Sequence, residues 1–524
     1  MKSISLLFFC LLGYFSAYCQ TTNYAEHIAP IIYKHCTSCH RTGEIGPFPL
    51  TNYQEVVANA EMIAQVTASK QMPPWKADPG YRRFQNENYL SAEEIRLISE
   101  WYKSGSPQGD PTKEPELPVF SQGSQLGVPD KVLSFKQAYL HKGNNVDEYR
   151  YFVLPTGLAE DKDLIALEVR PGNVAIVHHT LVWADTTGQA AKDDAKTPEY
   201  GYESPANSVF SSIDGQLPGY VPGQRPHLFA YEMGQRLKKG SDLKLQMHYA
   251  PTASDEWDST AVNLYFAKKP VKRYLKSKVM LPFGTVLTNG PFVIPANTTR
   301  EFHGVYTFTE NVSMLGISPH MHKLGKHWKV YAVKPNKDTV NLISIKDWDF
   351  NWQGTYHFTS PIILPKGTIV HAYAKYDNTT SNIFNPFSPP QMVTWGEGTS
   401  AEMYYLPLTW VSYQPGDENI VFDSGSTAVS DPEKWIIGTT LYPLSPNPSN
   451  GNARISFSLA TDTRISLAIC NSVGEPIRIP IKNRLYEQGL HYLDCDLSNE
   501  PNGHYFVTLQ AHGRTFTEKL LIQK

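Results

Sequence analysis

The sequence predicts a multidomain, mainly β protein that has one small helical module near its N-terminus. Its 524 residues exceed what one ordinary domain holds. Its composition, with 39 Pro, 35 Gly, 12% aromatic and only 19% charged residues, is typical of short strands joined by turns. From about Val119 to Tyr413, apolar and polar residues alternate in short runs, as in "DLIALEVRPG", "SDLKLQMHYAP" and "TIVHAYAKYDNTT", and no long amphipathic helix is evident. We therefore expect antiparallel sandwiches in this region.

We expect seven segments along the chain. The net charge of -3 gives no electrostatic reason to expect a nucleic-acid partner for any of them. The segments are a signal peptide (1–19), a small α-helical module (20–107), a linker (108–120), two β-sandwich subdomains (121–268 and 269–415), a second linker (416–440) and a terminal β-sandwich (441–524).

The N-terminus has the features of a secretory signal peptide. Lys2 precedes an apolar run from Ile4 to Phe15, and small residues follow. A lipid anchor at Cys19 is an alternative, although the bulky Tyr18 stands just before it. No later segment approaches the roughly 20 apolar residues of a membrane-spanning helix. We therefore expect an exported protein without a transmembrane segment, either secreted or attached to the outer-membrane surface.

The helical module carries the C-x-x-C-H pattern of covalent haem attachment. Cys36 and Cys39 are spaced to form thioethers with the two vinyl groups, and His40 then lies under the ring as an axial ligand. A redox C-x-x-C pair and half of a zinc site are the alternatives. A zinc site would need a second Cys/His pair nearby, and none follows. Because haem is attached covalently outside the cytoplasm, the predicted export agrees with haem c.

A second axial ligand is expected downstream, and Met72 lies in a Pro-flanked turn that suits it. Met62 is the competitor, but its place in a predicted helix over 52–69 favours burial. A capping box, Ser91-x-x-Glu94, predicts another helix that ends near Gly105. Short helices around C-x-x-C-H resemble a cytochrome c domain. The Pro-rich stretch after it has no apolar periodicity and is predicted to be a linker.

The histidines of the middle region are grouped. In a strand, residues i and i+2 share a face, so His320 and His322 can reach one metal ion while Met321 points the other way. His178 and His179 are adjacent and face opposite sides of a regular strand, so both can bind one metal only at a strand end, bulge or twist. Two sets of possible copper ligands result: His178, His179 and His248, followed by His320, His322 and Met403.

The order of these motifs resembles a known family. The HH pair, "LQMHY", "HMHKLGK" and "GTSAEM" follow one another as in the copper type II, ascorbate-dependent monooxygenases, which include the peptidylglycine α-hydroxylating and dopamine β-monooxygenases. The resemblance covers roughly residues 126–415. It implies two eight-stranded jelly-roll subdomains that face each other across a solvent-filled cleft, each holding one copper ion. It also implies that the three histidines bind the electron-transfer copper, that the His/His/Met set binds the copper where O2 reacts, and that Gln246 lies beside the first site.

The chain also departs from this family. The peptide-hydroxylating members have an Arg where Ser318 stands, so a peptide carboxylate is an unexpected substrate, and Tyr405 stands where they have an Asn. The family's disulfides are absent. The segment "DWDFNWQGTYHF" is similar to bacterial, cytochrome-fused relatives, and its residues Trp348, Phe350 and Trp352 are expected to be sheet or core residues. A structural role is expected for His303, His327, His357 and His371.

The resemblance implies an exported copper-dependent monooxygenase that uses O2 to hydroxylate a C–H bond of an unknown small organic substrate. The family takes its electrons from ascorbate. Because a haem motif precedes the copper motifs here, we expect an external reductant to supply electrons through the haem to the His178/His179/His248 copper. The alternative is a non-catalytic, exported haem and copper protein that transfers electrons or binds a surface. The complete set of three-plus-three ligands argues against that alternative.

The last segment resembles the C-terminal sorting domain of the type IX secretion system. The matching parts are "PNPSNG", the turn at Val473-Gly474, "NGHYFV" and the Lys-ended final strand. The resemblance implies a small Ig-like β-sandwich that the secretion machinery reads and that is in some cases removed. An ordinary Ig-like binding module is the alternative. Cys470 and Cys495 either pair or stay free, and the sequence leaves both possibilities open.

Overall fold

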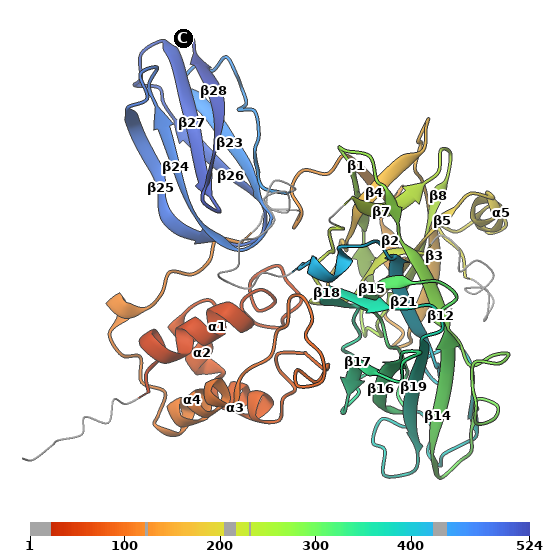
Figure 1. The fold of residues 1–524 in the computed structure, drawn as a ribbon. Helices are drawn as coiled ribbons and strands as arrows, with labels where there is room; N and C mark the ends of the chain where they lie inside the picture. Colours follow the sequence, from red (N-terminus) through yellow and green to blue (C-terminus); the bar gives the residue numbers. More distant parts are fainter. Residues whose placement is uncertain (1–21, 121–123, 204–215, 230–231, 423–437) are drawn as a thin grey trace, which may run out of the picture. The chain divides into compact units, whose positions relative to one another are not determined.

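The computed structural model describes residues 22–120, 124–203, 216–229, 232–422 and 438–524. The predicted signal peptide and most of the predicted second linker lie outside these ranges. The described chain is mainly β, and its longer helices belong to the N-terminal part (Figure 1). It forms two compact units, of which the smaller comprises residues up to Thr37 together with Pro49–Pro73 and Leu90–Pro115. None of the described helices is both long and apolar enough to cross a bilayer.

The smaller unit is helical, as the capping box and the apolar periodicity predict. Ser91 accepts a hydrogen bond from the Glu94 backbone N–H and the Glu94 carboxylate accepts one from that of Ser91, so the capping box is confirmed. Trp101 and Tyr24 are completely buried between the helices. The elements are η1 (Tyr24–Ile28), α1 (Ala29–His35), α2 (Tyr53–Ala58), α3 (Ala60–Ala68), α4 (Ala92–Lys103) and η2 (Pro111–Lys113).

The structure corrects two sequence expectations in this unit. The helix predicted over 52–69 is interrupted at Asn59, whose backbone leaves the helical region, so two short helices result. Met62 was predicted to be buried, but 51% of its surface is exposed. The buried face of α3 instead carries Ile63, Ala64 and Thr67, and Met62 lies on the outer face.

Two stretches within the predicted helical module, 38–48 and 74–89, belong to the larger unit. The second of these packs on the strands that follow. Phe84 forms a β-bridge with Phe358 and stacks on its ring, and the Gln85 N–H donates to the His357 carbonyl at 2.8 Å. Trp75 contacts the Tyr356 ring at 5.4 Å between centroids. The segment is thus an integral part of the β-sheet core rather than a loop of the helical unit.

The first β-sandwich of the larger unit has one apolar core between two sheets, ordered β3-β8-β5-β6 and β1-β10-β4-β7-β11, with a small β2-β9 pair. The neighbours are antiparallel except β7 and β11. Its elements are β1 (Lys131–Ser134), β2 (Tyr139–His141), β3 (Glu148–Pro155), β4 (Lys162–Arg170), β5 (Val177–Asp185), α5 (Gln189–Asp194), β6 (Gln216–Tyr220), β7 (Met233–Leu237), β8 (Asp242–Tyr249), β9 (Glu256–Asp258), β10 (Ala261–Phe266) and β11 (Arg273–Tyr274).

The second β-sandwich pairs the sheets β12-β21-β15-β18 and β14-β19-β16-β17, and a short β13-β20 pair accompanies them. Its core is the largest in the described chain and includes Trp328, Tyr376 and Tyr404. Its elements are β12 (Lys276–Met280), β13 (Val293–Ile294), β14 (Thr298–Thr307), β15 (Val312–Ile317), β16 (Gly325–Val333), β17 (Thr339–Ile345), β18 (Tyr356–Leu364), β19 (Ile369–Asn378), β20 (Val393–Thr394), β21 (Leu406–Ser412) and η4 (Asp417–Asn419).

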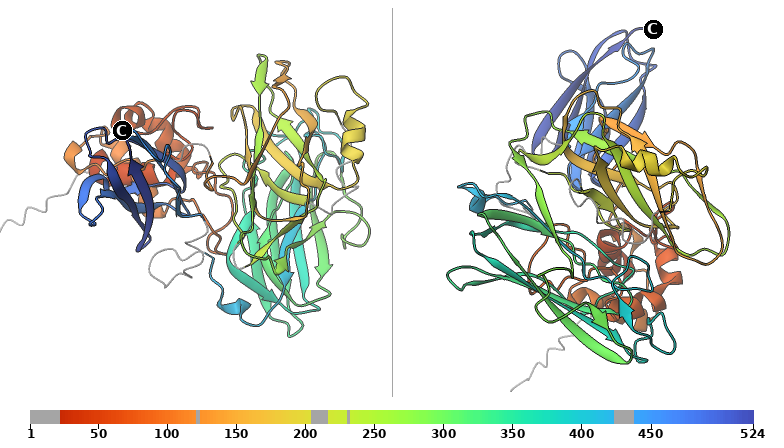
Figure 2. Two further views of the ribbon diagram at one scale, coloured as in Figure 1. Left: turned by 90° about the horizontal axis from the view of Figure 1, so that it is seen from above. Right: turned by 90° about the vertical axis from the view of Figure 1, so that its right-hand side faces the viewer.

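The third β-sandwich, near the C-terminus, is a compact body in each view (Figure 2). Its sheets, β22-β23-β26 and β25-β24-β27-β28, bury Phe457, Leu467 and Val507 between them. Cys470 and Cys495 are unpaired. Its strands are β22 (Thr440–Leu441), β23 (Asn452–Leu459), β24 (Thr463–Cys470), β25 (Pro476–Tyr486), β26 (Gly489–Asp496), β27 (Gly503–Ala511) and β28 (Arg514–Ile522).

A buried ion pair joins the ends of the first two sandwiches. Both carboxylate oxygens of Asp417 lie 2.7 Å from the Arg273 guanidinium, and Ser313 donates to the same carboxylate. Burial acts to raise the pKa of Asp417, but these donors hold it below its ordinary value. The stability that the pair contributes is therefore present above the unfolded-state pKa of 3.8 and is lost as the pH falls through the lower folded-state value.

We therefore expect Asp417→Asn to destabilise the protein at pH 7 by leaving Arg273 buried without its counter-ion. The difference in unfolding free energy between wild type and variant should shrink as the pH approaches 2, because the wild-type carboxyl is then protonated. Urea unfolding at pH 7, 5, 3.5 and 2 measures this difference. Asp338→Asn, in the exposed turn between β16 and β17, is the matched control. A difference that stays constant over the whole range would contradict the role of the ion pair.

Candidate metal centre

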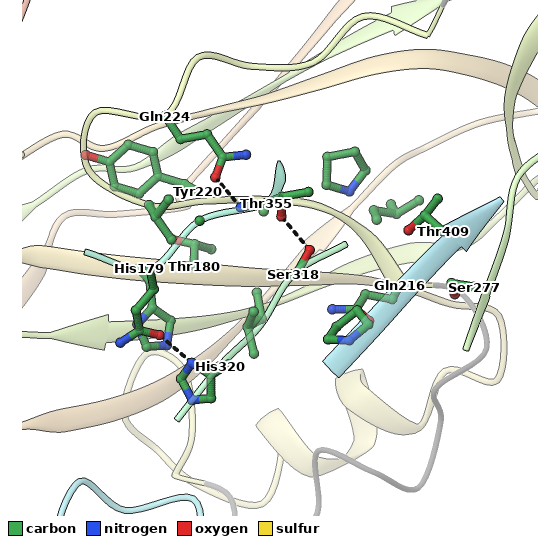
Figure 3. Close-up of a pocket in the computed structure, with 18 of the residues that line it drawn as sticks. His179, Thr180, Gln216, Tyr220, Gln224, Ser277, Ser318, His320, Thr355 and Thr409 are labelled. Carbon is green, nitrogen blue, oxygen red and sulfur yellow. Dashed lines mark hydrogen bonds between the residues drawn. The ribbon is translucent and has the colours of Figure 1, made fainter. Parts of the chain in front are cut away.

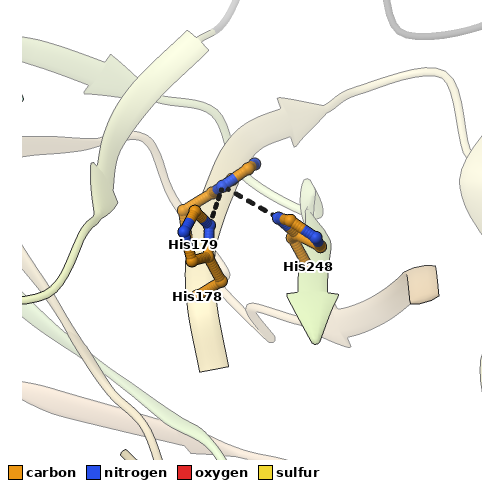
Figure 4. A group of neighbouring side chains, drawn as sticks. All are labelled: His178, His179 and His248. Carbon is orange, nitrogen blue, oxygen red and sulfur yellow. Dashed lines mark hydrogen bonds between the residues drawn. The ribbon is translucent and has the colours of Figure 1, made fainter. Parts of the chain in front are cut away.

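His178, His179 and His248 converge at the edge of the first sandwich (Figure 4). His178 and His179 stand at the start of β5, and His248 stands opposite on β8. The Nδ1 atom of His179 lies 3.2 Å from Nδ1 of His178 and 3.3 Å from Nδ1 of His248. Three imidazole nitrogens aimed at one point are the donor set of a copper or zinc ion.

A β-bulge allows two adjacent histidines to share this point. In the β5–β8 pairing Val177 faces Tyr249 and His179 faces His248, so His178 is an extra residue with no partner of its own. Because the bulge rotates the chain locally, the two neighbouring side chains do not point to opposite faces. From the sequence alone it was open whether two adjacent histidines could bind one metal ion. The tertiary structure brings both side chains to one site.

Asp147 orients the third histidine. Its carboxylate lies 2.7 Å from Nε2 of His248, and the Tyr149 ring stacks on the imidazole at 4.2 Å. A proton on Nε2 leaves the Nδ1 lone pair for a metal ion. Burial acts to raise the pKa of Asp147, but the hydrogen bond from His248 and the neighbouring positive charges lower it. Nothing in the sequence marked Asp147, because 101 residues separate it from its partner.

His320, His322 and Met403 come together on the second sandwich. The sequence predicted that both histidines lie on a regular strand. In the structure they instead follow the end of β15 in irregular chain. His320 forms a β-bridge with Tyr405, two residues after Met403. The side chain of Met321 is completely buried in the core, so it points away from the histidines as predicted.

Both histidines of this second set have their Nδ1 atoms occupied. Nδ1 of His322 lies 3.0 Å from the Ala401 carbonyl oxygen, and Nδ1 of His320 is hydrogen-bonded to the Gln353 side-chain oxygen. A proton held on each Nδ1 leaves the two Nε2 atoms as electron-pair donors. The imidazole rings are 5.1 Å apart and perpendicular. Gln353 lies close in sequence to Trp348, Phe350 and Trp352, which were expected to be sheet or core residues. Its hydrogen bond to His320 was not anticipated.

Glu402 is hydrogen-bonded to the backbone of two of the possible ligands in the second set, His322 and Met403. Its side chain is completely buried and accepts hydrogen bonds from the backbone N–H groups of His322, Leu324 and Met403 at 2.6–3.1 Å. Burial raises the pKa of Glu402 to about 8, against the lowering effect of these donors. The "GTSAEM" motif contains this residue, but only the structure shows that its carboxylate joins the two ligand-bearing loops.

Burial disfavours the charged form of four imidazoles of the two sets, those of His178, His179, His320 and His322. Burial lowers the pKa of His178 and His322 to about 4 and that of His320 to about 3. Burial and the neighbouring His248 lower the pKa of His179 as well. Because a metal ion binds only an unprotonated nitrogen, these side chains fit a metal without first losing a proton.

Phe350 lies between the two histidine sets. Its ring centroid is 5.5 Å from that of His178, nearly parallel, and 5.7 Å from that of His322, nearly perpendicular. Phe350 therefore has contacts outside the core and departs from the structural role expected for it. Trp348 is buried in the core, as expected.

A cavity of about 230 Å³ separates the first two sandwiches and reaches both ligand sets (Figure 3). His179, His320, His322 and Met403 line it, as does Ser318. Ser318 donates to the Thr355 hydroxyl at 2.9 Å, and the Thr355 N–H donates to the Gln224 side chain at 3.0 Å. Gln246 also lines the cavity and donates to Tyr151 at 2.6 Å. The position that distinguishes this chain from the peptide-hydroxylating enzymes is thus part of the cavity wall.

Other histidines occupy two further places. His357 lines the cavity and stacks on His227 at 3.6 Å with nearly parallel rings, and His227 was not anticipated. His303 and His371 lie on β14 and β19, away from the cavity lining, and are hydrogen-bonded to each other at 3.0 Å. His327 lies on β16.

The haem motif has local features that suit its predicted chemistry. Nδ1 of His40 lies 3.0 Å from the Phe48 carbonyl oxygen. A proton held on Nδ1 leaves the lone pair of Nε2 available to a metal ion. A Cβ on Gly46 would lie 2.7 Å from the Cys39 carbonyl oxygen, so only glycine closes this loop. Cys36 caps α1, and neither it nor Cys39 forms a disulfide within the described part of the chain. Met72 follows α3 in the smaller unit.

Comparisons with known proteins identify one part of the chain. Residues 443–523 match the family described as the secretion system C-terminal sorting domain. This match supports the predicted type IX sorting domain and export through that machinery to the cell surface or beyond. No curated protein matches the chain.

Solved structures add no functional information. The chain is similar to β-glucuronidases of Dictyoglomus thermophilum (7% identity, TM-score 0.17, covering 48% of this chain and 44% of that one) and Faecalibacterium prausnitzii (7% identity, TM-score 0.13, covering 44% and 38%). A β-glucuronidase of Ruminococcus gnavus is similar at 8% identity, with a TM-score of 0.12, covering 44% and 36%. The chain therefore spans less than half of each of these proteins. Scores this low show no shared fold.

Replacing Asp147 tests the three-histidine site. Asp147→Asn should weaken Cu(I) binding at that site by about 10–100-fold, because a neutral amide oxygen accepts the Nε2 proton of His248 less strongly than a carboxylate does. Competition with a chromophoric Cu(I) chelator measures the affinity. Asp338→Asn should leave it unchanged. An unaltered affinity in Asp147→Asn would show that the carboxylate does not orient the ligand.

Proposed function

We propose that the chain is an exported copper-dependent monooxygenase that hydroxylates a C–H bond of a small organic molecule. The observation that carries this proposal is that one cavity is lined by members of two separate groups of possible metal ligands, the histidines of the first sandwich and His320, His322 and Met403 of the second. The finer fold proposed with it is two jelly rolls, preceded by a cytochrome c-like module and followed by an Ig-like sorting domain. The sorting-domain match supports the exported location.

The donor chemistry of the two sets supports copper at both. Two bound copper ions would supply one-electron redox chemistry and O2 activation. Three neutral imidazoles suit an ion that alternates between Cu(I) and Cu(II), and two imidazoles with the soft thioether of Met403 favour Cu(I). The chain's own contribution is to fix these donors. Asp147, Gln353 and the Ala401 carbonyl each hold one imidazole proton, and Glu402 holds the backbone of His322 beside that of Met403.

The reaction balances with an external reductant. One oxygen atom of O2 enters the C–H bond and the other leaves as water, which consumes two electrons and two protons. Cys36, Cys39, His40 and Met72 would hold a haem, which would supply one-electron transfer toward the His178/His179/His248 site. The hydrogen bond between Nδ1 of His40 and the Phe48 carbonyl oxygen supports this assignment, because it leaves the lone pair of Nε2 available.

Metal and haem analysis is the first test. We expect about two copper ions and one haem per chain, measured by atomic spectroscopy and the pyridine haemochrome spectrum. Reductant should then drive O2 uptake by the copper-loaded protein. A protein that binds both cofactors without taking up O2 would instead be an electron carrier.

Stopped-flow spectroscopy tests the electron route. Reduced haem should re-oxidise rapidly when the chain holds Cu(II), and slowly when copper is removed. His178→Ala should slow the re-oxidation while leaving the haem spectrum unchanged. A haem that never re-oxidises in copper-loaded protein under O2 would rule out the route.

A further inference from the structure

The cavity between the sandwiches is lined with carboxamides. Five glutamines contribute to its wall: Gln216, Gln224, Gln235, Gln246 and Gln353. They come from β6, β7, β8 and two loops, so five separate stretches of chain deliver the same functional group to one space. Glutamine offers both a hydrogen-bond donor and an acceptor without a charge.

Three of the five side chains keep an uncommitted polar atom. The side-chain oxygen of Gln235 is buried and has no hydrogen-bond partner among the described residues, although its amide donates to the Gln216 carbonyl at 2.9 Å. The side-chain oxygens of Gln216 and Gln224 accept from Tyr405 and Thr355, which leaves their NH2 groups to donate. A buried acceptor without a donor costs free energy, so the site favours a ligand that supplies one.

The polar atoms of Gln216 and Gln235 lie away from the histidines of the two sets. In Figure 3, His179 and His320 are at one end of the cavity, and Gln216, Ser277 and Thr409 are at the other. Gln235 belongs to the Gln216 end through its hydrogen bond. The cavity also has an apolar lining that includes Leu181, Leu217 and Leu275. A ligand that spans it presents carbon to the histidines and a polar group to the glutamines.

The lining offers little charge for an ionic ligand. Apart from histidines, the acidic and basic side chains among the described lining residues are Lys276 and Glu397. The Lys276 ammonium is 2.7 Å and 3.0 Å from the two carboxylate oxygens of Glu310, so it is already neutralised. Glu397 acts electrostatically on Tyr149, which stacks on His248, so it belongs to the histidine end.

We infer that the cavity takes an uncharged small molecule that has an amide or hydroxyl head group and an apolar body. The head donates to Gln235 and accepts from Gln216, and the body extends along the leucines toward the histidines. The assignment of the histidine end as the reacting end depends on the proposed monooxygenase function. The recognition of a neutral head depends only on the glutamines.

Three probes that share one carbon skeleton test this inference. The copper-loaded, full-length chain is titrated calorimetrically, without reductant, with 3-phenylpropanamide, 3-phenylpropanoate and 3-phenylpropylamine. The amide should bind at least 10-fold more tightly than the anion and the cation. Gln235→Glu, which places a carboxylate where the unpaired acceptor lies, should reverse the order in favour of the amine. Gln391→Glu, an exposed change outside the cavity lining, should leave the order unchanged.

Each outcome of the titration either supports or overturns the inference. Tightest binding of the acid or the amine by the wild type, no binding of any probe, or an unchanged order in Gln235→Glu would overturn the inference. No turnover occurs in the titration, so its result is independent of the proposed function. A chain that takes up O2 but prefers an ionic probe refutes only this inference, whereas a chain that prefers the amide without reductant-driven O2 uptake refutes only the monooxygenase.

Discussion

Met403→Leu should abolish O2-dependent turnover while leaving the fold and the haem intact. Leucine conserves the buried volume but has no thioether, so the second copper ion loses its soft ligand. The copper content should fall from about two ions per chain to about one. Loss of a residue that only orients a metal ligand costs about 10–100-fold, so loss of a ligand itself should lower O2 uptake by more than about 100-fold.

Two further variants complete this experiment. His322→Ala should give the same loss of copper and of O2 uptake, because it removes one Nε2 donor from the same set. Met392→Ala, at a methionine that is 66% exposed, should change neither quantity. Haem reduction should be normal in all three proteins. Full O2 uptake by Met403→Leu would show that Met403 is a packing residue and would remove the proposed O2 site.

Glu402→Ala should destabilise the second sandwich and release its copper ion. The carboxylate accepts hydrogen bonds from three buried backbone N–H groups, on His322, Leu324 and Met403. Each buried donor left without a partner costs about 1–3 kcal/mol, so for three donors we expect the free energy of unfolding to fall by about 3–9 kcal/mol. Urea unfolding followed by tryptophan fluorescence measures the change.

An isosteric variant separates hydrogen bonding from side-chain volume. Glu402→Gln keeps the shape but turns an NH2 group toward backbone donors, so it should lose a large part of the same stability. Glu301→Ala, on the exposed face of β14 in the same sandwich, is the control and should lie within about 0.5 kcal/mol of the wild type. Wild-type stability in Glu402→Gln would mean that the N–H groups are satisfied without the carboxylate.

The sequence was a good guide wherever a pattern is local. The capping box at Ser91 and Glu94 gave the start of α4, and the alternating run before Tyr249 gave β8. Local patterns failed where contacts with distant parts of the chain decide the burial or the pairing of a residue. Met62 has helical periodicity but lies on an exposed face of α3. The stretch 74–89 follows a predicted haem ligand in sequence, yet Phe84 pairs with a strand almost 300 residues later.

The sequence by itself determined the identities and order of the possible metal ligands and the mainly β class, because these depend on residue identity and on the period of a strand. Only the tertiary structure decided that His178 and His179 act together, because a bulge in β5 depends on its register with β8. It also supplied Asp147, Gln353 and Glu402, which act through hydrogen bonds to residues that are 33 to 101 positions away. A polar side chain has no periodicity that reveals its partner, so such contacts exist only once the sheets have paired.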